Sequence, residues 1–94
     1  MATKQTAKVT VYSKGYCPYC KMTKATLKKL GLKFEEIDIT FSRKHGKEMR
    51  ERSNRHTVPQ IFIDDHHIGG NDDLQAALRN GELEKILEVN AAVV

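Results

Sequence analysis

The tetrapeptide Cys17-Pro18-Tyr19-Cys20 constrains this chain more than any other stretch, because it stands where a strand pattern changes to a helix pattern. Residues 9–12 are rich in β-branched side chains, which favour a strand. Beyond them, side chains recur at helical spacing along one face, and lysines mark the opposite face. The positions are Tyr19, Met22, Thr26 and Leu30 on the first face and Lys21, Lys24 and Lys28 on the other. Pro18 suits the first helical position, where a missing N–H group costs nothing.

The same tetrapeptide predicts a redox-active dithiol. Cys17 is expected at or just before the N-terminus of the helix, beside unpaired backbone N–H groups and the positive end of the helix dipole. That position favours a thiolate, which is the form that attacks disulfides. Cys20 follows three residues later on the same side of the first turn, close enough to form a disulfide with Cys17.

Two other interpretations of the cysteine pair are weaker. A structural zinc site needs four ligands, and the chain has no second cysteine pair. Its histidines do not follow at the spacing of a zinc finger; they are His45, His56, His66 and His67. A structural disulfide across so short a loop would remove little chain entropy from the unfolded state. The sequence context therefore favours redox chemistry over a metal or a structural bridge.

The length and the distribution of charge narrow the class of protein. Ninety-four residues predict one domain, residues 1–94. Residues 1–34 hold eight lysines and no acid, so the cysteine end should be electropositive and favour thiolates and anionic partners. Nucleic acid is the alternative partner for a basic surface. The lysines lie on a helix face without interleaved aromatic residues or a binding motif, which favours a solvated face instead.

The chain ends and the hydropathy indicate a cytoplasmic protein. No stretch is long and apolar enough for a membrane span. Residues 1–8 lack the apolar core of a secretory signal, and two cysteines without an export signal suit the reducing cytosol. Ala91-Ala92-Val93-Val94 is expected to be a frayed end.

The middle of the chain continues an alternation of strands and helices. Gly31 is expected to end the first helix, and residues 33–39 to form a strand parallel to the first one, through a right-handed crossover. Residues 42–54 predict a charged helix that covers the sheet thinly. Ser42 can cap this helix, and Glu48 with Arg52 forms a favourable pair four residues apart.

The last third predicts a hairpin followed by helices. The apolar run of residues 61–63 should be a strand buried on both faces, paired with a short strand at Ile68. His66 and His67 suggest a metal, but neighbours on a strand point in different directions, so no site is expected. Asn71 or Asp72 can cap the next helix, and its glycine-preceded N-terminus could hold a carboxylate. The last helix is marked by Leu83, Ile86 and Leu87. The order predicts a small α/β sandwich with a mixed sheet.

Three motifs together resemble those of a dithiol glutaredoxin. They are Cys17-Pro18-Tyr19-Cys20 after a strand, Thr57-Val58-Pro59 before an apolar strand, and Gly69-Gly70 with Asp72-Asp73. The resemblance runs from Val9 to Leu87. It implies an α/β thioredoxin fold, with a mixed four-stranded sheet flanked by helices in the order strand, helix, strand, helix, strand, strand, helix. It further implies reduction of protein disulfides and of glutathione mixed disulfides, with glutathione as co-substrate and no tightly bound cofactor or metal.

The resemblance assigns roles at the cysteine end of the site. Cys17 matches the nucleophile and Cys20 the resolving cysteine of the family. Lys14 matches the basic residue that reaches the glycyl carboxylate of glutathione, and Tyr19 matches the aromatic residue that flanks the tripeptide.

The other two motifs match the rest of a glutathione site. Val58 matches the residue whose backbone pairs with the cysteinyl part, with Thr57 beside it, and Pro59 matches a cis-proline that faces the cysteines. The γ-glutamyl end is matched by Gly70, Asp72 and Asp73, the last of which faces its ammonium.

Three positions depart from the family pattern. Asn71 stands where many relatives carry a further cysteine. Gly46 stands where some carry a glutamine or arginine that helps to bind the glycyl carboxylate, and Lys44 or Lys47 is the candidate substitute. Pro18 argues against the iron–sulfur-bridged dimers of relatives with other tetrapeptides.

Partners and alternatives complete the expectation. The implied partners are glutathione and disulfide-containing or glutathionylated client proteins, with ribonucleotide reductase as one client, for a monomer that binds neither nucleic acid nor membranes. A redoxin reduced by thioredoxin reductase is the alternative enzyme; it would lack the glutathione-binding groups, and Lys14, Tyr19 and Asp73 are present. A non-catalytic carrier of an iron–sulfur cluster or zinc is the alternative of another class.

Overall fold

The computed structural model describes residues 7–91, and side chains as far as residue 87. Its elements, in chain order, are β1 (Val9–Ser13), α1 (Pro18–Lys29), β2 (Phe34–Asp38), α2 (Arg43–Ser53), β3 (Gln60–Ile63), β4 (His66–Gly69), α3 (Asn71–Arg79) and α4 (Glu82–Ala91). Of the chain end for which fraying is expected, only Ala91 belongs to the described part. Among the described helices, none has the length and apolar character needed to cross a membrane.

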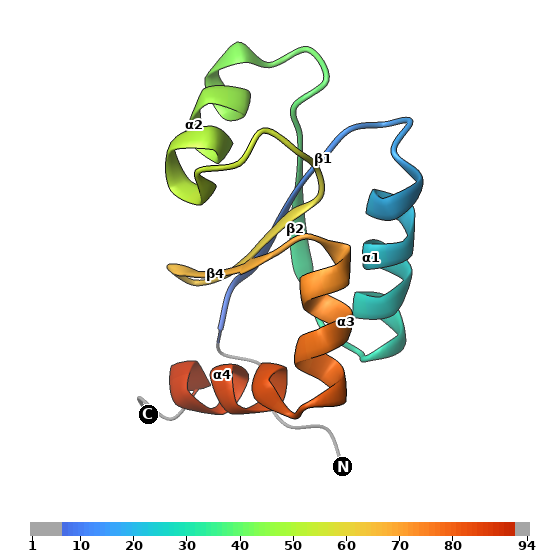
Figure 1. Ribbon diagram of the computed structural model, residues 1–94, viewed down its shortest axis with the longest axis vertical. Helices are drawn as coiled ribbons and strands as arrows, with labels where there is room; N and C mark the ends of the chain where they lie inside the picture. The colour runs from blue at the N-terminus through green and yellow to red at the C-terminus, as the bar shows by residue number, and fades with distance from the viewer. Residues whose placement is uncertain (1–6, 92–94) are drawn as a thin grey trace.

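The strands form the mixed four-stranded sheet that the sequence predicts. Their spatial order is β2-β1-β3-β4. β1 runs parallel to β2 and antiparallel to β3, and β4 returns antiparallel to β3. In Figure 1, α1 and α3 lie side by side, and α2 stands apart from them, on the opposite face of the sheet. The fold is therefore the thioredoxin fold, with the cysteine tetrapeptide at the end of a central strand.

Alternating side chains of the central strands supply two separate hydrophobic clusters. The larger one joins the sheet to α1, α3 and α4, and its buried members are Ala7, Val9, Val11, Leu27, Ile61, Ile63, Leu74, Ala77 and Leu83. The smaller one lies beneath α2, and its buried members are Tyr12, Ile39, Met49 and Phe62. Met49 is the one large apolar side chain that α2 buries, which confirms the thin covering expected there.

Tyr12 connects the smaller cluster to polar groups of α2. Its ring is fully buried and meets Phe62 edge-on, with the centroids 5.7 Å apart. Its hydroxyl donates to Glu48 Oε1 at 3.0 Å and accepts from Arg52 Nη1 at 2.9 Å. Glu48 and Arg52 are thus joined through this hydroxyl and attract each other, which confirms the favourable pair. Ser42 caps α2 as predicted, since its Oγ accepts from the His45 N–H at 3.2 Å.

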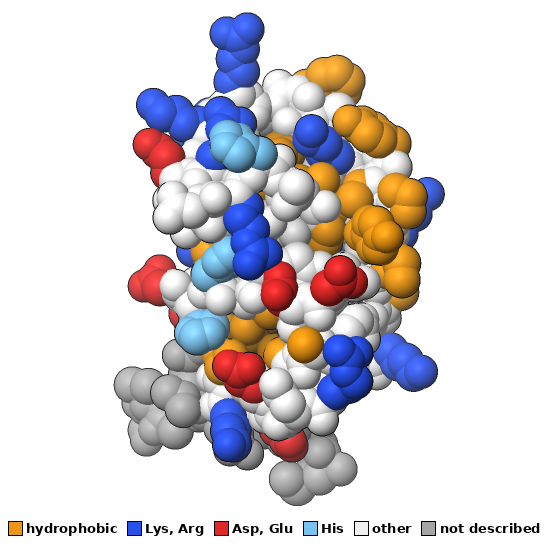
Figure 2. Space-filling view, in the orientation of Figure 1, with side chains coloured by type: hydrophobic (Ala, Val, Ile, Leu, Met, Phe, Trp, Pro, Cys, Tyr) orange, Lys and Arg blue, Asp and Glu red, His pale blue; other side chains and the backbone are white. Residues whose placement is uncertain are grey.

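The buried face of α1 differs from the one that the sequence pattern marks. Its buried side chains are Cys20, Thr23 and Leu27. The predicted face is largely solvent-exposed: the exposed fractions are 58% for Tyr19, 51% for Met22 and 45% for Leu30. The true face carries short side chains, so a pattern based on large residues selects its neighbour. Figure 2 shows hydrophobic side chains gathered on the side of the molecule where α1 lies.

A buried hydrogen bond fixes α1 against α3. Thr23 Oγ1 donates to Asn71 Oδ1 at 3.0 Å, and both residues are buried. Asn71, which stands where relatives carry a cysteine, therefore has a structural partner in this chain. A buried amide oxygen without its donor carries the full cost of lost solvation.

Thr23→Val should destabilise the fold by about 1–3 kcal/mol, because the nearly isosteric change leaves Asn71 Oδ1 unpaired. Thr26→Val is the matched control in the same helix: its hydroxyl bonds Met22 O and Gln75 Nε2 near the surface, where water can replace them. Urea unfolding of both variants and the wild type gives the free energies. An equal loss in the two variants would contradict the importance of the buried bond.

Candidate active site

Cys17 occupies the start of α1, as the sequence predicts. It is the N-cap residue, with extended backbone angles (φ −86°, ψ 114°), and Pro18 follows in the first turn. Cys17 Sγ accepts a hydrogen bond from the Cys20 N–H at 3.1 Å, so sulfur takes the part that an oxygen plays in most caps. Cys17 is 8% exposed and Cys20 is fully buried, and both are free thiols. The positive end of the helix therefore faces Cys17.

The Thr57-Val58-Pro59 loop lies against the cysteines. The Val58–Pro59 peptide bond is cis, in agreement with the prediction for Pro59. Cys17 Sγ lies 3.8 Å from the Val58 carbonyl oxygen, to which the thiol donates. Two segments about forty residues apart in sequence thus meet at this sulfur, because β1 and β3 are neighbours in the sheet.

A chain of side-chain hydrogen bonds, which the sequence did not predict, holds this loop. The buried Gln60 Nε2 donates to Thr57 O at 3.0 Å and to Thr57 Oγ1 at 3.2 Å. Gln60 Oε1 lies 2.7 Å from His67 Nε2, which donates to it. Burial lowers the pKa of His67, and its ring stacks on Phe62 with the centroids 4.9 Å apart. His67 therefore supports the loop, while His66 beside it is exposed.

Burial distinguishes the two thiols electrostatically. Desolvation, with the hydrogen bond to Cys17, raises the pKa of the Cys20 thiol to about 12, and a backbone hydrogen bond from Lys14 opposes this. Cys20 is therefore a neutral thiol at physiological pH. Cys17, at 8%, is the more exposed of the two cysteines.

Part of the positive charge expected near the cysteines is neutralised by a salt bridge. Lys24 Nζ lies 2.8 Å from Glu36 Oε2 in a salt bridge. This lysine and the Ser13 hydroxyl lower the pKa of Glu36, so the carboxylate is charged at neutral pH. The lysine-rich helix face is thus partly neutralised from β2.

Cys17 lies between two pockets. The α3 pocket, of about 280 Å³, is lined by Tyr19, Arg55, Thr57, Val58, Pro59, Gly70, Asn71, Asp72 and Asp73. The α2 pocket, of about 640 Å³, is lined by Lys14, Ile39, Thr40, Phe41, Ser42, Arg43, Gly46, Lys47 and Arg50. Cys17 is hydrogen-bonded to one lining residue of each pocket: its thiol donates to the Val58 carbonyl at 3.8 Å, and its N–H donates to Lys14 O at 3.2 Å. The structure therefore collects seven of the eight predicted glutathione residues in one pocket and places Lys14 in the other.

Asp73 has partners that the sequence did not suggest. Its Oδ2 accepts from the Gly70 N–H at 2.9 Å and from Arg55 Nη1 at 2.8 Å. Both bonds lower the pKa of Asp73, that from Arg55 more strongly. The helix begins at Asn71 with Gly70 as its N-cap, so the prediction that Asn71 or Asp72 caps it is wrong. Arg55 places a cation in the α3 pocket just before the Thr57 loop.

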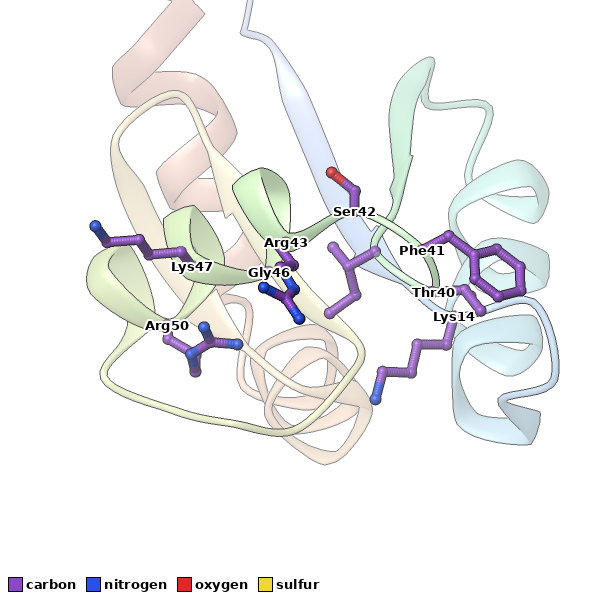
Figure 3. A pocket seen from close by; sticks show the side chains of 9 residues that line it. Lys14, Thr40, Phe41, Ser42, Arg43, Gly46, Lys47 and Arg50 are labelled. Atoms are coloured by element: carbon purple, nitrogen blue, oxygen red, sulfur yellow. The ribbon is translucent and has the colours of Figure 1, made fainter.

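The α2 pocket identifies which lysine stands near Lys14. Lys47 lines this pocket with Gly46, whereas Lys44 does not. Arg43 and Arg50 also line it and were missed by the sequence reasoning. Figure 3 shows Lys14 on one side of the pocket and the α2 side chains on the other, with Lys47 directed away from the two arginines. The signal for this face was present as the spacing 43, 46, 47 and 50, which is one side of a helix.

A dithiol at a helix N-terminus, opposite a cis-proline loop on a mixed four-stranded sheet, defines a thiol–disulfide oxidoreductase of the thioredoxin fold. Within the part of the chain that the structure describes, no three His, Cys, Asp or Glu side chains gather as a metal site would need. The glutaredoxin family model matches residues 9–68. The chain belongs to the glutaredoxin family.

Individual relatives extend this likeness over most of the chain. Glutaredoxin 3 of Escherichia coli strain K12 is 48% identical over 82 residues, which cover 87% of this chain and 99% of that protein. The solution structure of glutaredoxin from Brucella melitensis is 42% identical, with a TM-score of 0.77, and the match covers 92% of this chain and 94% of that one. The crystal structure of the buckwheat glutaredoxin–glutathione complex has a TM-score of 0.80 at 28% identity and covers 96% and 84% of the two chains.

In the reduced protein, a limiting amount of iodoacetamide at neutral pH should alkylate Cys17 and spare Cys20. The reason is that Cys20 is fully buried and its raised pKa keeps it a thiol, which is the unreactive form. Peptide mapping by mass spectrometry measures the ratio, which should be at least about tenfold in favour of Cys17. Unfolding in urea at the same pH is the control and should bring the two rates together. Equal rates in the folded protein would contradict the assignment.

Proposed function

We propose that this chain reduces protein disulfides and glutathione mixed disulfides, with Cys17 as nucleophile, Cys20 as resolving thiol and glutathione as the source of electrons. One observation carries the proposal: a pocket formed by the predicted glutathione residues opens beside the more exposed of two free thiols. A structural neighbour, the buckwheat glutaredoxin, binds glutathione in its crystal structure, which supports glutathione as the thiol that supplies the electrons.

The two pockets suggest an orientation for glutathione across Cys17. Its glycyl carboxylate lies toward Lys14, and its cysteinyl backbone pairs with the backbone of Val58. Its γ-glutamyl end enters the α3 pocket, where Asp73 and Asp72 face the ammonium and Arg55 stands near the α-carboxylate. Opposite charges at the two ends of the tripeptide fix its direction more than its affinity.

Reduction of a mixed disulfide then needs a single protein thiol. The Cys17 thiolate attacks the glutathione sulfur, and the client leaves as a thiolate that takes up a proton. Cys17 is now joined to glutathione. A second glutathione thiolate attacks this bond, which releases oxidised glutathione and restores the Cys17 thiolate.

Reduction of a protein disulfide requires both thiols. Cys17 attacks one client sulfur and forms a mixed disulfide with the client. Cys20 loses its proton as it attacks Cys17, and the client sulfur leaves and is protonated, so an intramolecular disulfide remains. Two glutathione molecules return this disulfide to the dithiol and become oxidised glutathione. Because Cys20 is a neutral thiol until it attacks, the nucleophilic role belongs to Cys17.

The geometry favours glutathione over thioredoxin reductase as electron source. The alternative enzyme would lack glutathione-binding groups, yet Tyr19 and Asp73 line one pocket beside Cys17 and Lys14 lines the other. We further propose a monomer that acts in the cytoplasm, where a glutathione pool is maintained. Its clients would be disulfide-containing or glutathionylated proteins, with ribonucleotide reductase as one of them.

Neutralising the predicted groove should weaken substrate binding. Asp73→Asn keeps an oxygen for the Gly70 N–H but removes the charge, and Lys14→Ala removes the opposite one. Each should raise the Michaelis constant for a glutathionylated peptide roughly two- to fivefold, since exposed ion pairs contribute about 0.2–1 kcal/mol. Asp65→Asn, in the exposed hairpin turn, is the control. Unchanged Michaelis constants in both groove variants would refute this orientation.

The two cysteines should separate in function. Cys17→Ser should abolish all activity, because the attacking atom is lost for every substrate. Cys20→Ser should retain reduction of glutathione mixed disulfides and lose most reduction of protein disulfides, which need an intramolecular thiol. Both activities are measured on the same Cys20→Ser preparation, with glutathione as the only reductant.

Loss of both activities to the same extent in Cys20→Ser would reject the single-thiol route. It would favour instead an enzyme that always works through the Cys17–Cys20 disulfide, as the alternative redoxin would. A higher rate on mixed disulfides is compatible with the proposal, because the unproductive intramolecular disulfide cannot form in this variant.

A further inference from the structure

The α2 pocket concentrates positive charge that no acid of the described chain neutralises. Lys14, Arg43, Lys47 and Arg50 line it, and no carboxylate does. Within residues 7–87 the structure pairs none of these four with an acid, whereas other basic residues near the cysteines, such as Lys24, have carboxylate partners. Uncompensated cations around one hollow raise the local concentration of anions and favour an anionic ligand.

The pocket is also larger than one carboxylate requires. Its volume is about 640 Å³, against about 280 Å³ for the α3 pocket. Gly46 lines it, and a Cβ there would lie 3.4 Å from Arg50 Nη1, so a long side chain at this position would compete with that guanidinium for space. In the proposed orientation, the glycyl carboxylate of glutathione neutralises one cation at most. Three cations and most of the volume are left without a role.

A client polypeptide can reach the cations of the α2 pocket that glutathione leaves unpaired. In the proposed orientation, a client strand joined to Cys17 would take the place of glutathione beside the Val58 backbone and run in the same direction. The residues that follow its cysteine then extend past Lys14, at about 3.3 Å per residue. Because Lys14 lines the same pocket as Arg43 and Arg50, side chains two or three residues beyond the cysteine would enter that pocket.

We propose that the α2 pocket binds acidic side chains at the second and third positions after the attacked cysteine of a disulfide client, and so selects such clients. This rests on the proposed function, because it uses the direction assigned to the bound strand. Arg43 and Arg50 supply guanidinium groups, which suit carboxylates better than lysine does. Phe41, 98% exposed at the edge of the same pocket, offers apolar contact for the methylene groups of aspartate or glutamate.

The test uses two symmetric peptide disulfides, so that attack on either sulfur is equivalent. In the acidic peptide, Cys-Gly-Asp-Glu ends each half; in the neutral one, Cys-Gly-Asn-Gln replaces it with side chains of the same shape. Reduction consumes two glutathione molecules per disulfide and is followed with glutathione reductase. The wild type should show roughly fivefold higher kcat/KM for the acidic dimer, as expected for two exposed ion pairs. The ratio should fall toward one as salt is raised.

Substitutions in α2 test whether the α2 pocket causes the preference for the acidic peptide. Arg43→Ala with Arg50→Ala should bring the acidic-to-neutral ratio close to one, and Gly46→Gln should lower it by displacing Arg50. Lys44→Ala is the matched control, because Lys44 is an exposed cation on α2 that does not line the pocket, and it should retain the wild-type ratio.

Three results would overturn the inference. They are equal kcat/KM for both dimers in the wild type, a preference that survives the double arginine variant, and an equal loss in Lys44→Ala. Failure of the wild type to reduce either dimer would overturn it as well. The same preparation is also assayed with a small glutathione mixed disulfide. Turnover of this substrate shows that the proposed function holds even where the inference about the α2 pocket fails.

Discussion

The start of α1 is the constraint on which the rest of this site depends. A helix must satisfy its first backbone N–H groups, and here the Cys17 sulfur accepts one of them, from Cys20. Pro18 removes another donor and fixes the first turn. The same turn leaves Cys17 slightly exposed, at 8%, and carries Cys20 fully into the interior, where burial keeps it a neutral thiol. One local structure thus creates two unlike sulfurs from two identical residues.

The sheet then determines what faces the Cys17 sulfur. Because β3 pairs with β1, the Val58–Pro59 loop arrives beside Cys17. The Gln60 side chain holds that loop by a hydrogen bond to Thr57 O. The hydrogen bond between Thr23 and Asn71 fixes α1 to α3, the helix that carries Asp72 and Asp73. These contacts join segments far apart in sequence, so the pocket exists only in the folded chain.

The sequence predicted the order of strands and helices along the chain, the dithiol and most residues of the α3 pocket, because each has a local pattern or a motif. It could not predict partners across the fold. Arg55 and Asp73 lie far apart in the chain, and nothing local connects them. Helix α1 misled the prediction because its buried face includes Cys20 and Thr23, which a search for large apolar residues passes over. The basic face of α2 had a readable spacing, but only Lys47 of its cations was considered for binding, and residues 42–54 were otherwise expected to be a charged helix that covers the sheet thinly.

The central claim is that glutathione supplies the electrons that pass through Cys17. The most direct measurement compares two electron sources for the same disulfide substrate, by NADPH consumption: glutathione with glutathione reductase, and thioredoxin reductase alone. The account predicts turnover with the glutathione system and essentially none with thioredoxin reductase. Equal or faster turnover with thioredoxin reductase would contradict it, and the pockets beside Cys17 would then need another ligand.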